Sequence, residues 1–426
     1  MQRSLAAVAI TLVFSGVARA DEPTPAAVPA GEQGLPTAPA PPPEPPDNLS
    51  ISIVTFGPGD HPFFKFGHDA ILVRDKATGR DLVYNFGTFL FDSPRLIGEF
   101  MKGRLTYWLS VAPLATVVDG YRRENRTVAV QELALAPEAK RELAARLQEN
   151  ARPENRAYKY DYFLDNCSTR VRDAIDRATN GALRKASYSV PGRLTLRGQA
   201  LRMTADVVWL YLALDLVLAG STDKPVDRWG EMYIPEELAR GLRAVSLDGA
   251  PGPRPLVVSE ASLASADRPP PRQEPPSRFV SMLLVGLAIG LCFVALGWAA
   301  PHRPAARACF GVVIALWSLA VGFIGCFLLY TWGFTDHIVA HRNENIFLCA
   351  PWGLVLGGLG FGVAFGSRRA TLTALRLAVA ALLLGLLGWG LKAHPAFHQH
   401  NAELIALLLP PWFGMAVGLL HSRHGS

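Results

Sequence analysis

The last third of the chain consists of long apolar stretches that are separated by short polar loops. Each stretch has enough residues to cross the apolar core of a bilayer, which is about 30 Å thick and needs roughly 20 helical residues. The pattern therefore predicts an all-α transmembrane bundle over residues 279–421, with five spans at residues 279–300, 309–332, 347–366, 371–391 and 402–420.

The segment before this bundle alternates between apolar and polar positions in several short runs, which is typical of strands. NLSISIVTFG, DAILVRD and DLVYNFGTF carry Ile, Val and Tyr and are bounded by Gly or Asp. The loop at residues 76–80 predicts a hairpin between the last two runs. Helical spacing of Leu and Ala follows at residues 137–150 and 168–179. We expect one α+β domain over residues 49–247.

One apolar segment inside this domain allows two interpretations. Residues 204–221, TADVVWLYLALDLVLAGS, are apolar but contain Asp206 and Asp215. The segment is either a buried helix of the domain or a helix that lies on the membrane surface.

The flanking segments predict export and flexible connections. Residues 1–20 have a basic start, an apolar core and an Ala-Arg-Ala ending, as in a secretory signal peptide. Residues 21–48 are rich in Pro and Ala, and we expect a disordered tether there. Residues 248–278 contain PGPRP and RPPPRQEPP and predict a similar linker before the first span.

The charges of the polar loops predict the orientation in the membrane. Arginine occurs in PHRPAAR, in SRR and in the C-terminal HSRHGS, which the positive-inside rule places in the cytoplasm. We therefore expect a multi-pass protein of the inner membrane, with the α+β domain in the periplasm and a cytoplasmic tail at residues 422–426. The net charge of +6 is mild, and for an exported domain it gives no reason to expect a nucleic-acid partner.

One cysteine stands apart from the other four. Cys292, Cys309, Cys326 and Cys349 lie in the apolar stretches, where a thiol acts as a small hydrophobe, whereas Cys167 is alone in the α+β domain. An exported thiol without a partner in its domain is paired intermolecularly or is free and reactive. Cys167 begins a predicted helix, where the helix dipole favours the thiolate.

A base for this thiol can come from few residues. His61 and His68 are the histidines of the domain, and His68 begins a predicted strand after Gly67. Asn85 lies on the next strand and could hold the imidazole in the useful tautomer. The backbone N–H of Cys167 and the side chain of Asn166 are candidate oxyanion donors. The alternative is structural: the cysteine belongs to a core, and the histidine lies in a turn or on the surface.

Other polar residues could contact a substrate or only stabilise the fold. Arg122 and Arg126, with Glu124 and Asn125, predict either an ion-pair network or a site for a phospholipid headgroup. Asp161 and Asp165 are expected to cap the helix or pair with nearby arginines, or else to take part in catalysis. Four aromatic residues are expected to be core or interfacial anchors, with substrate contact as the alternative: Tyr158, Tyr160, Tyr162 and Phe163.

The loops expected on the periplasmic side carry His337, Asn343, Asn345 and Asn401. We expect these four residues to line a polar entrance for lipid headgroups. Further histidines occur in the same loops, but their spacing is irregular and no Cys or carboxylate pair completes a set of metal ligands. No metal and no cofactor are expected.

The order of histidine strand and later cysteine helix resembles the circularly permuted papain-like enzymes of the NlpC type and of the lecithin:retinol acyltransferase superfamily. Five ordered motifs, FGHDAILVRD, VYNFGTFLFD, YRRENRTV, YKYDYFLDNCSTRVRD and DRWGEMYIPEEL, together resemble the bacterial lipoprotein N-acyltransferase Lnb family. That resemblance also extends to TDHIVAHRNENIFLCAPWGL and HNAELIALLLPPW. It implies a thiol-dependent acyltransferase that moves an acyl chain from a phospholipid to the terminal amine of a diacylglyceryl-cysteine lipoprotein.

Two other functions stay open. The same thiol and imidazole could serve a membrane-anchored cysteine peptidase or amidase that acts on the cell wall, although one anchor would then suffice. A transporter or receptor would use the spans but would leave the lone thiol unexplained. The small number of ionisable residues within the spans disfavours an ion path.

Overall fold

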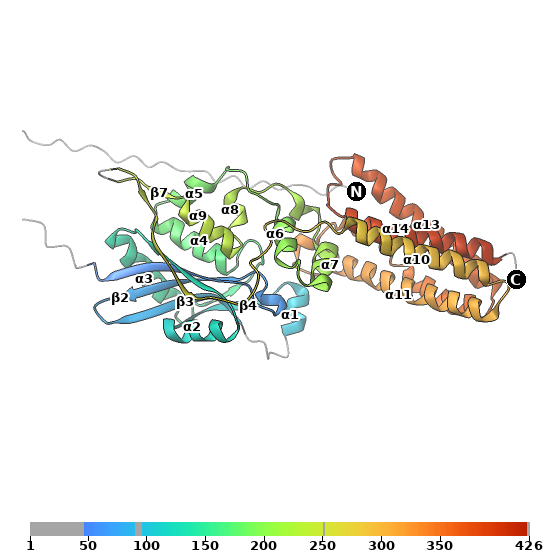
Figure 1. The fold of residues 1–426 in the computed structure, drawn as a ribbon, viewed down its shortest axis with the longest axis horizontal. Coiled ribbons are helices and arrows are strands. Elements are labelled where there is room, and N and C mark those ends of the chain that lie inside the picture. The colour runs from blue at the N-terminus through green and yellow to red at the C-terminus, as the bar shows by residue number, and fades with distance from the viewer. Residues whose placement is uncertain (1–46, 90–95, 250–251, 424–426) are drawn as a thin grey trace, which may run out of the picture. The chain divides into compact units, whose positions relative to one another are not determined.

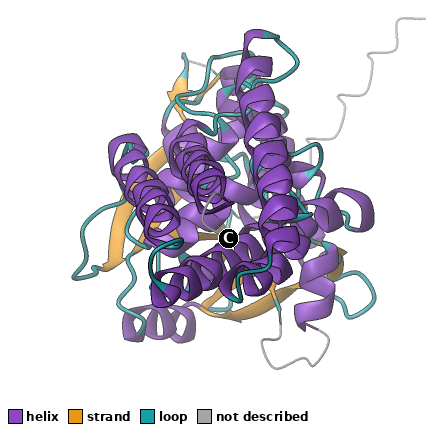
Figure 2. Ribbon diagram, turned by 90° about the vertical axis from the view of Figure 1, so that its right-hand side faces the viewer, coloured by secondary structure: helices purple, strands orange, loops and turns teal. Residues whose placement is uncertain are grey.

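The computed structural model describes residues 47–89, 96–249 and 252–423. The predicted signal peptide, the tether up to Pro46 and the last three residues of the tail lie outside the described part. The chain forms an α/β region followed by an all-helical region, as Figure 1 and Figure 2 show.

The α/β region is built on a seven-stranded sheet in which every neighbouring pair is antiparallel. The strand order is β6-β4-β3-β2-β1-β5-β9. The three predicted strands are confirmed as β1, β2 and β3, and the hairpin joins the last two. The bounds are β1 Leu49–Phe56, β2 His68–Asp75, β3 Arg80–Thr88, β4 Thr106–Pro113, β5 Val128–Leu133, β6 Ala157–Lys159 and β9 Val257–Ala264.

Each face of the sheet buries one set of alternating residues. Ile53 and Ile71 face the helices α3 (Pro137–Asn150), α4 (Cys167–Ala178) and α9 (Pro235–Arg243) in one core. Val54 and Ala70 face α2 (Leu114–Arg123) in a second core. Because a fully buried Ile or Val contributes about 1.5–3 kcal/mol, a shift of one residue in register would lose many such contributions at once. The cores therefore fix the position of every residue along β2 and β3.

The remaining helices of this region are short and connect the sheet to the helical region. They are α1 Leu96–Lys102, α5 Ala182–Ser187, α6 Leu196–Met203, α7 Val208–Val217, α8 Arg228–Glu231 and the 3-10 helices Pro62–Phe64 and Gly220–Asp223. In α7, Tyr211 and Asp215 are buried, whereas Val208 and Trp209 are exposed. The buried face agrees with a helix of the domain, and the position on the membrane surface stays a prediction.

The segment that the sequence predicts as a linker is partly folded. Val257–Ala264 forms β9, the edge strand beside β5, and a two-stranded pair joins β7 (Ser246–Leu247) to β8 (Arg254–Pro255). The proline clusters at both ends predicted a linker, although the segment between them, LVVSEASLA, can add a strand to an open sheet edge. The α/β region therefore extends beyond the predicted boundary at Leu247.

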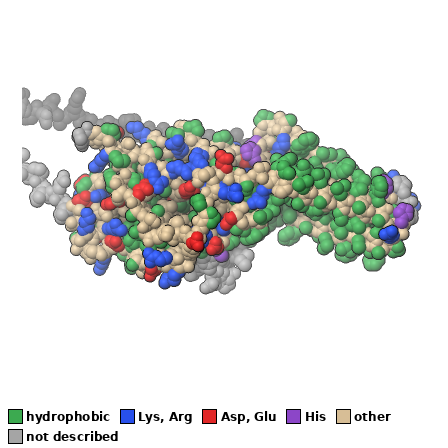
Figure 3. Space-filling view, in the orientation of Figure 1, with side chains coloured by type: hydrophobic (Ala, Val, Ile, Leu, Met, Phe, Trp, Pro, Cys, Tyr) green, Lys and Arg blue, Asp and Glu red, His purple; other side chains and the backbone are tan. Residues whose placement is uncertain are grey.

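Four helices of the C-terminal region are long and apolar enough to cross a membrane. They are α10 Phe279–Ala299, α11 Pro304–Phe334, α13 Arg368–Gly390, which a 3-10 turn extends to Ala393, and α14 Ala402–Ser422. Figure 3 shows that apolar side chains cover the visible face of this region and that Lys, Arg and His lie at its far end. These helices match four of the five predicted spans, and the chain has a multi-pass membrane region.

The segment predicted as the third span has only a short helix, α12 Gly353–Ala364. Its 12 residues extend about 18 Å, which is less than the thickness of the bilayer core. Pro351 disfavours a helix at the preceding positions, where a 3-10 helix at Glu344–Phe347 is followed by the buried Leu348, Cys349 and Ala350. Irregular backbone at membrane depth is tolerated where protein surrounds it. The fifth crossing therefore stays a prediction.

Glycines allow the membrane helices to approach closely. A Cβ atom on Gly297 of α10 would lie 2.3 Å from the Cα atom of Gly418 of α14, and one on Gly290 would lie 2.7 Å from the carbonyl oxygen of Pro410. On α11, a Cβ on Gly311 would lie 2.4 Å from the carbonyl oxygen of Gly360 of α12. Lipid provides no hydrophobic driving force between helices, so small residues at such crossings stabilise the pair by allowing close van der Waals packing.

Candidate active site

His68 and Asn85 come together at the beginning of the β2–β3 pair. His68 is the first residue of β2, where its ring stacks on Phe56 at 5.7 Å between centroids. The side chain of Asn85 on β3 is hydrogen-bonded to His68. This bond fixes the ring orientation, as the sequence interpretation of Asn85 requires.

Cys167 is the first residue of α4 and is buried, with 8% of its surface exposed. Asn166 precedes it as the N-cap: its side-chain oxygen accepts from Thr169 N at 2.9 Å, and the Thr169 hydroxyl accepts from Asn166 N at 2.8 Å. The amide nitrogen of Asn166 donates to the carbonyl oxygens of Tyr162 and Tyr233. Asn166 thus holds the start of α4, and its amide has no hydrogen left for a substrate.

Gly87 lies between the thiol and the imidazole. A Cβ atom at this position would be 3.4 Å from Cys167 Cβ, 3.8 Å from His68 Cε1 and 3.8 Å from the hydroxyl oxygen of Tyr158. The residue has a φ of +90°, and the β3–β4 register shifts between Asn85 and Thr88. Both features favour glycine. The missing side chain leaves a space that Cys167, His68 and the hydroxyl group of Tyr158 all border.

Replacing Gly87 by alanine should block this space. We expect the rate at which the Cys167 thiol reacts with an ester probe to fall by about 10²-fold or more, because a small displacement of reacting groups has that cost. The fold should lose about 1–2 kcal/mol from the left-handed backbone. The control is Gly79→Ala, since Gly79 has a φ of +68° and nothing within 4 Å of the added atom. Equal rates for the two variants would contradict the assigned role of Gly87.

The thiol and the imidazole are both neutral in the resting site. Burial, and the nearby charge of Asp69, raise the pKa of Cys167 to about 12, against backbone hydrogen bonds from Asp69, Ser168 and Cys167 itself that lower it. Burial and the positive charge of Arg126 lower the pKa of His68 to about 4. A neutral pair suits an imidazole that takes the proton during attack, rather than a preformed thiolate.

Asp69 is a buried carboxyl group that sequence reasoning did not assign to the site. It follows His68 on β2 and accepts hydrogen bonds from the hydroxyl groups of Thr55 at 2.9 Å and Ser168 at 2.8 Å. Burial raises its pKa to about 7 despite these bonds. A carboxyl group at this depth joins the strand that carries the base to the helix that carries the thiol.

The opposite shifts of Asp69 and His68 predict the pH dependence of stability. The native state holds the Asp69 proton more tightly than the unfolded state does, so this group makes the free energy of unfolding fall as the pH rises from about 4 to about 7. The lowered pKa of His68 makes it rise between about pH 4 and 6.5.

Between about pH 4 and 6.5, we expect the free energy of unfolding to rise with pH in Asp69→Asn, because only the His68 effect remains. We expect it to fall with pH in His68→Gln, because only the Asp69 effect remains. Each slope is at most about 1.4 kcal/mol per pH unit. Thermal unfolding in detergent at several pH values measures both. Parallel curves for the two variants would contradict the opposed shifts.

Aromatic residues and one ion pair surround the thiol. Tyr158 on β6 and Tyr107 on β4 are opposite each other, and the charge of a Cys167 thiolate would raise the pKa of both. The guanidinium of Arg170 lies 3.5 Å above the ring of Tyr158, and Asp165 accepts two hydrogen bonds from it at 2.6 and 2.8 Å. Asp165 therefore pairs with Arg170, which is one of the two roles that the sequence allows.

The two predicted headgroup arginines lie in different surroundings. Arg122 is exposed and bonds to Asp119 and the carbonyl oxygen of Leu263. Arg126 is buried, donates to the carbonyl oxygen of Gly57 at 2.8 Å and lies over the ring of Tyr121. Arg126 acts on His68 through its charge. Headgroup binding by either arginine stays a prediction.

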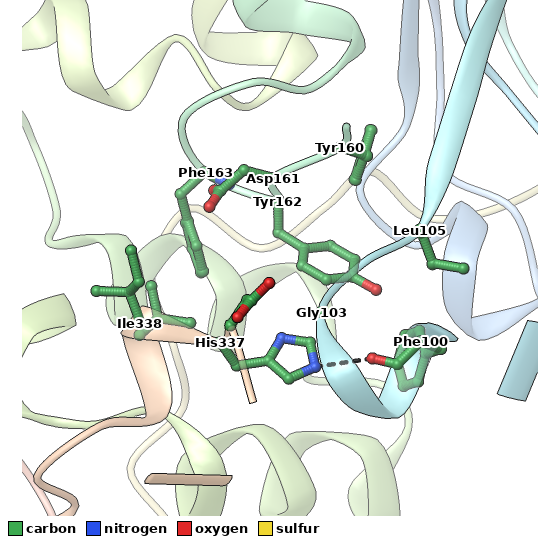
Figure 4. Close-up of a pocket in the computed structure, with 11 residues that line it drawn as sticks. Phe100, Gly103, Leu105, Tyr160, Asp161, Tyr162, Phe163, His337 and Ile338 are labelled. Carbon is green, nitrogen blue, oxygen red and sulfur yellow. Dashed lines mark hydrogen bonds between the residues drawn. The ribbon is translucent and has the colours of Figure 1, made fainter. Parts of the chain in front are cut away.

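His337 borders a pocket between the α/β region and the loop after α11, which Figure 4 shows. Its Nε2 atom is 2.8 Å from the carbonyl oxygen of Phe100, and Asp336 beside it pairs with Arg104 and Lys159 at 3.0 Å. Tyr160 also lines this pocket, and its ring stacks on Tyr107 at 4.0 Å. Aromatic side chains thus connect the pocket to the surroundings of Cys167.

Asn343, Asn345 and Asn401 hold the two regions together. Asn343 donates to the carbonyl oxygens of Leu216 and Val217, and Asn345 also donates to that of Leu216. Asn401 donates to Asn345 at 2.7 Å. All three side chains are buried. They satisfy the C-terminus of α7, so an additional contact with lipid headgroups stays a prediction.

A buried arginine reinforces this junction. Arg197 of α6 donates to Asp215 at 2.9 Å and to Asp223 at 2.8 Å, and all three side chains are nearly inaccessible to solvent. Asp223 also accepts from the backbone N–H of His400 at 3.0 Å, in the loop before α14. Arg197 was not identified from the sequence.

The described residues contain no group of three or more His, Cys, Asp or Glu side chains that could hold a metal ion. The sequence indicated Cys167, His68 and Asn85. The structure places Cys167 and His68 beside one glycine, Gly87, and bonds Asn85 to His68. The sequence did not indicate Gly87 or Asp69. It hints at the positive φ of Gly87 only through the preceding Asn85 and Phe86. It hints at a role of Asp69 only through the position of this residue after His68.

Comparisons with known proteins identify the part of the chain that carries these residues. Residues 44–199 match the family model of the Lnb N-terminal periplasmic domain. The comparison with curated proteins and the comparison with solved structures gave no match. The match includes His68, Asn85, Gly87 and Cys167 and ends before β9. The part of the chain that carries these residues is therefore similar to a periplasmic domain of the Lnb family, and a multi-pass membrane region follows it.

Proposed function

We propose that this protein is a thiol-dependent acyltransferase that moves an acyl chain from a phospholipid to the α-amine of a diacylglyceryl-cysteine lipoprotein. The observation that carries the proposal is that Cys167 and His68 both border the space beside Gly87, with Asn85 hydrogen-bonded to His68. The match of residues 44–199 to the Lnb N-terminal periplasmic domain supports a role in lipoprotein N-acylation.

In the first half of the reaction, the thiol becomes acylated. His68 takes the proton from Cys167 Sγ while the sulfur attacks the ester carbonyl carbon of the phospholipid, and an S–C bond forms. The C–O bond to the glycerol oxygen then breaks, and His68 returns the proton to that oxygen. The products are a lysophospholipid and a thioester on Cys167.

In the second half, the lipoprotein amine attacks the thioester carbonyl. His68 accepts a proton from the nitrogen as the N–C bond forms, and the sulfur leaves as the C–S bond breaks. The proton then passes to the sulfur, which restores the neutral pair. Asn85 holds the imidazole in one orientation through both halves.

The membrane region supports a lipid substrate. Four helices long enough to span a bilayer exceed what anchoring requires, and the pocket beside His337 lies where the α/β region meets the helices. We propose that acyl donors approach the thiol from this side, past Tyr160. The positive-inside loops further support a cytoplasmic C-terminus. A cell-wall amidase would use the same chemistry but would not need these helices.

Mass spectrometry of the purified protein tests the proposal. After incubation with phospholipid vesicles, the peptide that contains Cys167 should gain the mass of one acyl chain through a bond that hydroxylamine cleaves. A synthetic diacylglyceryl-cysteine peptide should then remove that mass and appear as the N-acylated product. Cleavage of a muropeptide, without any thioester from phospholipid, would instead support the amidase.

A further inference from the structure

We propose that Tyr158 is a catalytic residue of the acyl-transfer site, and that its hydroxyl group donates a hydrogen bond to the oxyanion that forms when a carbonyl is attacked. This inference rests on the proposed function and adds the electrophilic group that the reaction needs. Attack on an ester or thioester moves the carbonyl π-electron pair to oxygen, and the developing charge requires preorganised donors.

The hydroxyl group of Tyr158 has no other use in the part of the chain that the structure describes. Its oxygen is buried and has no hydrogen-bond partner among the described residues. An unbonded hydroxyl group costs about 1–3 kcal/mol when it is buried, so native proteins rarely keep one without a function.

The position of this oxygen fits the role. The point where a side chain on Gly87 would begin is 3.8 Å from Tyr158 Oη, 3.4 Å from Cys167 Cβ and 3.8 Å from His68 Cε1. A carbonyl group placed in that space would have the sulfur, the base and the hydroxyl donor around it. Such a common point for nucleophile, base and donor is the geometry that acyl transfer demands.

The surroundings keep Tyr158 in place and keep it a donor. Its strand pairs with β4, where it lies opposite Tyr107, and its ring carries the guanidinium of Arg170 at 3.5 Å. Asp165 holds that guanidinium through two hydrogen bonds. Burial raises the pKa of the phenol, so the hydroxyl keeps its proton, while the positive charge above the ring makes the O–H group a stronger donor.

The bonds balance in each step without a proton transfer from tyrosine. The S–C bond forms, the carbonyl oxygen takes the electron pair, and Tyr158 donates a hydrogen bond to that oxygen. When the tetrahedral intermediate collapses, the C=O double bond returns and the hydrogen bond weakens. The N–H groups at the start of α4 can act together with this hydroxyl as donors.

Two variants test the proposal, Tyr158→Phe and the control Tyr84→Phe. Both remove a tyrosine hydroxyl group from a strand of the same sheet, but Tyr158 Oη borders the space beside Gly87, whereas the side chain of Tyr84 is hydrogen-bonded to Gln148 of α3. The first probe is a p-nitrophenyl ester of a fatty acid, which acylates the thiol through an oxyanion. The second is iodoacetamide, which alkylates the thiol without forming one.

We expect Tyr158→Phe to slow acylation by the ester about 10²–10³-fold, the loss typical of one oxyanion donor, and to leave alkylation of Cys167 unchanged. Tyr84→Phe should keep both rates, and thermal unfolding should show that both variants are folded. An unchanged acylation rate in Tyr158→Phe, or an equal loss in both reactions, would overturn the proposal. Failure of the wild-type protein to form any thioester would overturn the proposed function itself.

Discussion

Replacing Cys167 by alanine should abolish both thioester formation and N-acylation of a lipoprotein peptide. We expect the rate to fall by about 10⁴-fold or more, because no other group in the site can carry the acyl chain between donor and acceptor. The measurement is mass spectrometry of the acceptor peptide after incubation of the purified variant in phospholipid vesicles.

The matched control is Cys292→Ala, which removes an exposed thiol from the apolar helix α10 and should leave the rate unchanged. Thermal unfolding of both variants distinguishes lost chemistry from a lost fold. N-acylation at the wild-type rate by the folded Cys167→Ala protein would refute the covalent mechanism.

Replacing Arg197 by leucine should have the largest effect on stability. The change leaves the carboxyl groups of Asp215 and Asp223 buried without the cation that pairs with them. Removal of one partner from such a buried pair typically costs about 3–5 kcal/mol in the free energy of unfolding. Thermal or denaturant unfolding in detergent measures the loss.

This loss should be smaller at pH 5 than at pH 8. Burial already raises the pKa of Asp215 to about 6, so at low pH its carboxyl group takes up a proton and no longer needs the cation. The control is Arg141→Leu, which breaks the partly exposed pair with Glu138 and should change stability by less than about 1 kcal/mol. Equal losses of free energy of unfolding for Arg197→Leu and Arg141→Leu would contradict a stabilising role of the Arg197 ion pairs.

The sequence predicted the elements whose apolar residues repeat with a clear period. The helices α3 and α4 follow their patterns because each buries one face in a core, and the strands β1, β2 and β3 follow theirs because alternate residues enter two cores. It predicted α12 as a full span because apolarity alone does not reveal that Pro351 interrupts the helix. It missed β9 because proline on both sides outweighed the short apolar run between them.

Local chemistry indicated some of the site, and tertiary packing provides the rest. A lone exported thiol at a helix start and a histidine at a strand start are visible in the sequence as Cys167 and His68. The space beside Gly87 arises only where a register shift in β3 meets the start of α4. The polar loop residues Asn343, Asn345 and Asn401 suggested solvent and headgroups. The amides of Asn343 and Asn345 instead donate to carbonyl groups of α7, and the amide of Asn401 donates to Asn345.

The edge strand β9 limits the distance between Cys167 and the membrane helices, because it shortens the connection between the sheet and α10. The chain pairs with the sheet up to Ala264. Hydrogen bonds then join four further residues to the same region, namely Asp267, Arg272, Gln273 and Pro276. Only a short segment is left before the first membrane helix. The connection between the α/β region and the membrane helices is therefore short and held in place. For the proposed reaction, this means that both lipid substrates have to reach the thiol at a fixed height above the bilayer.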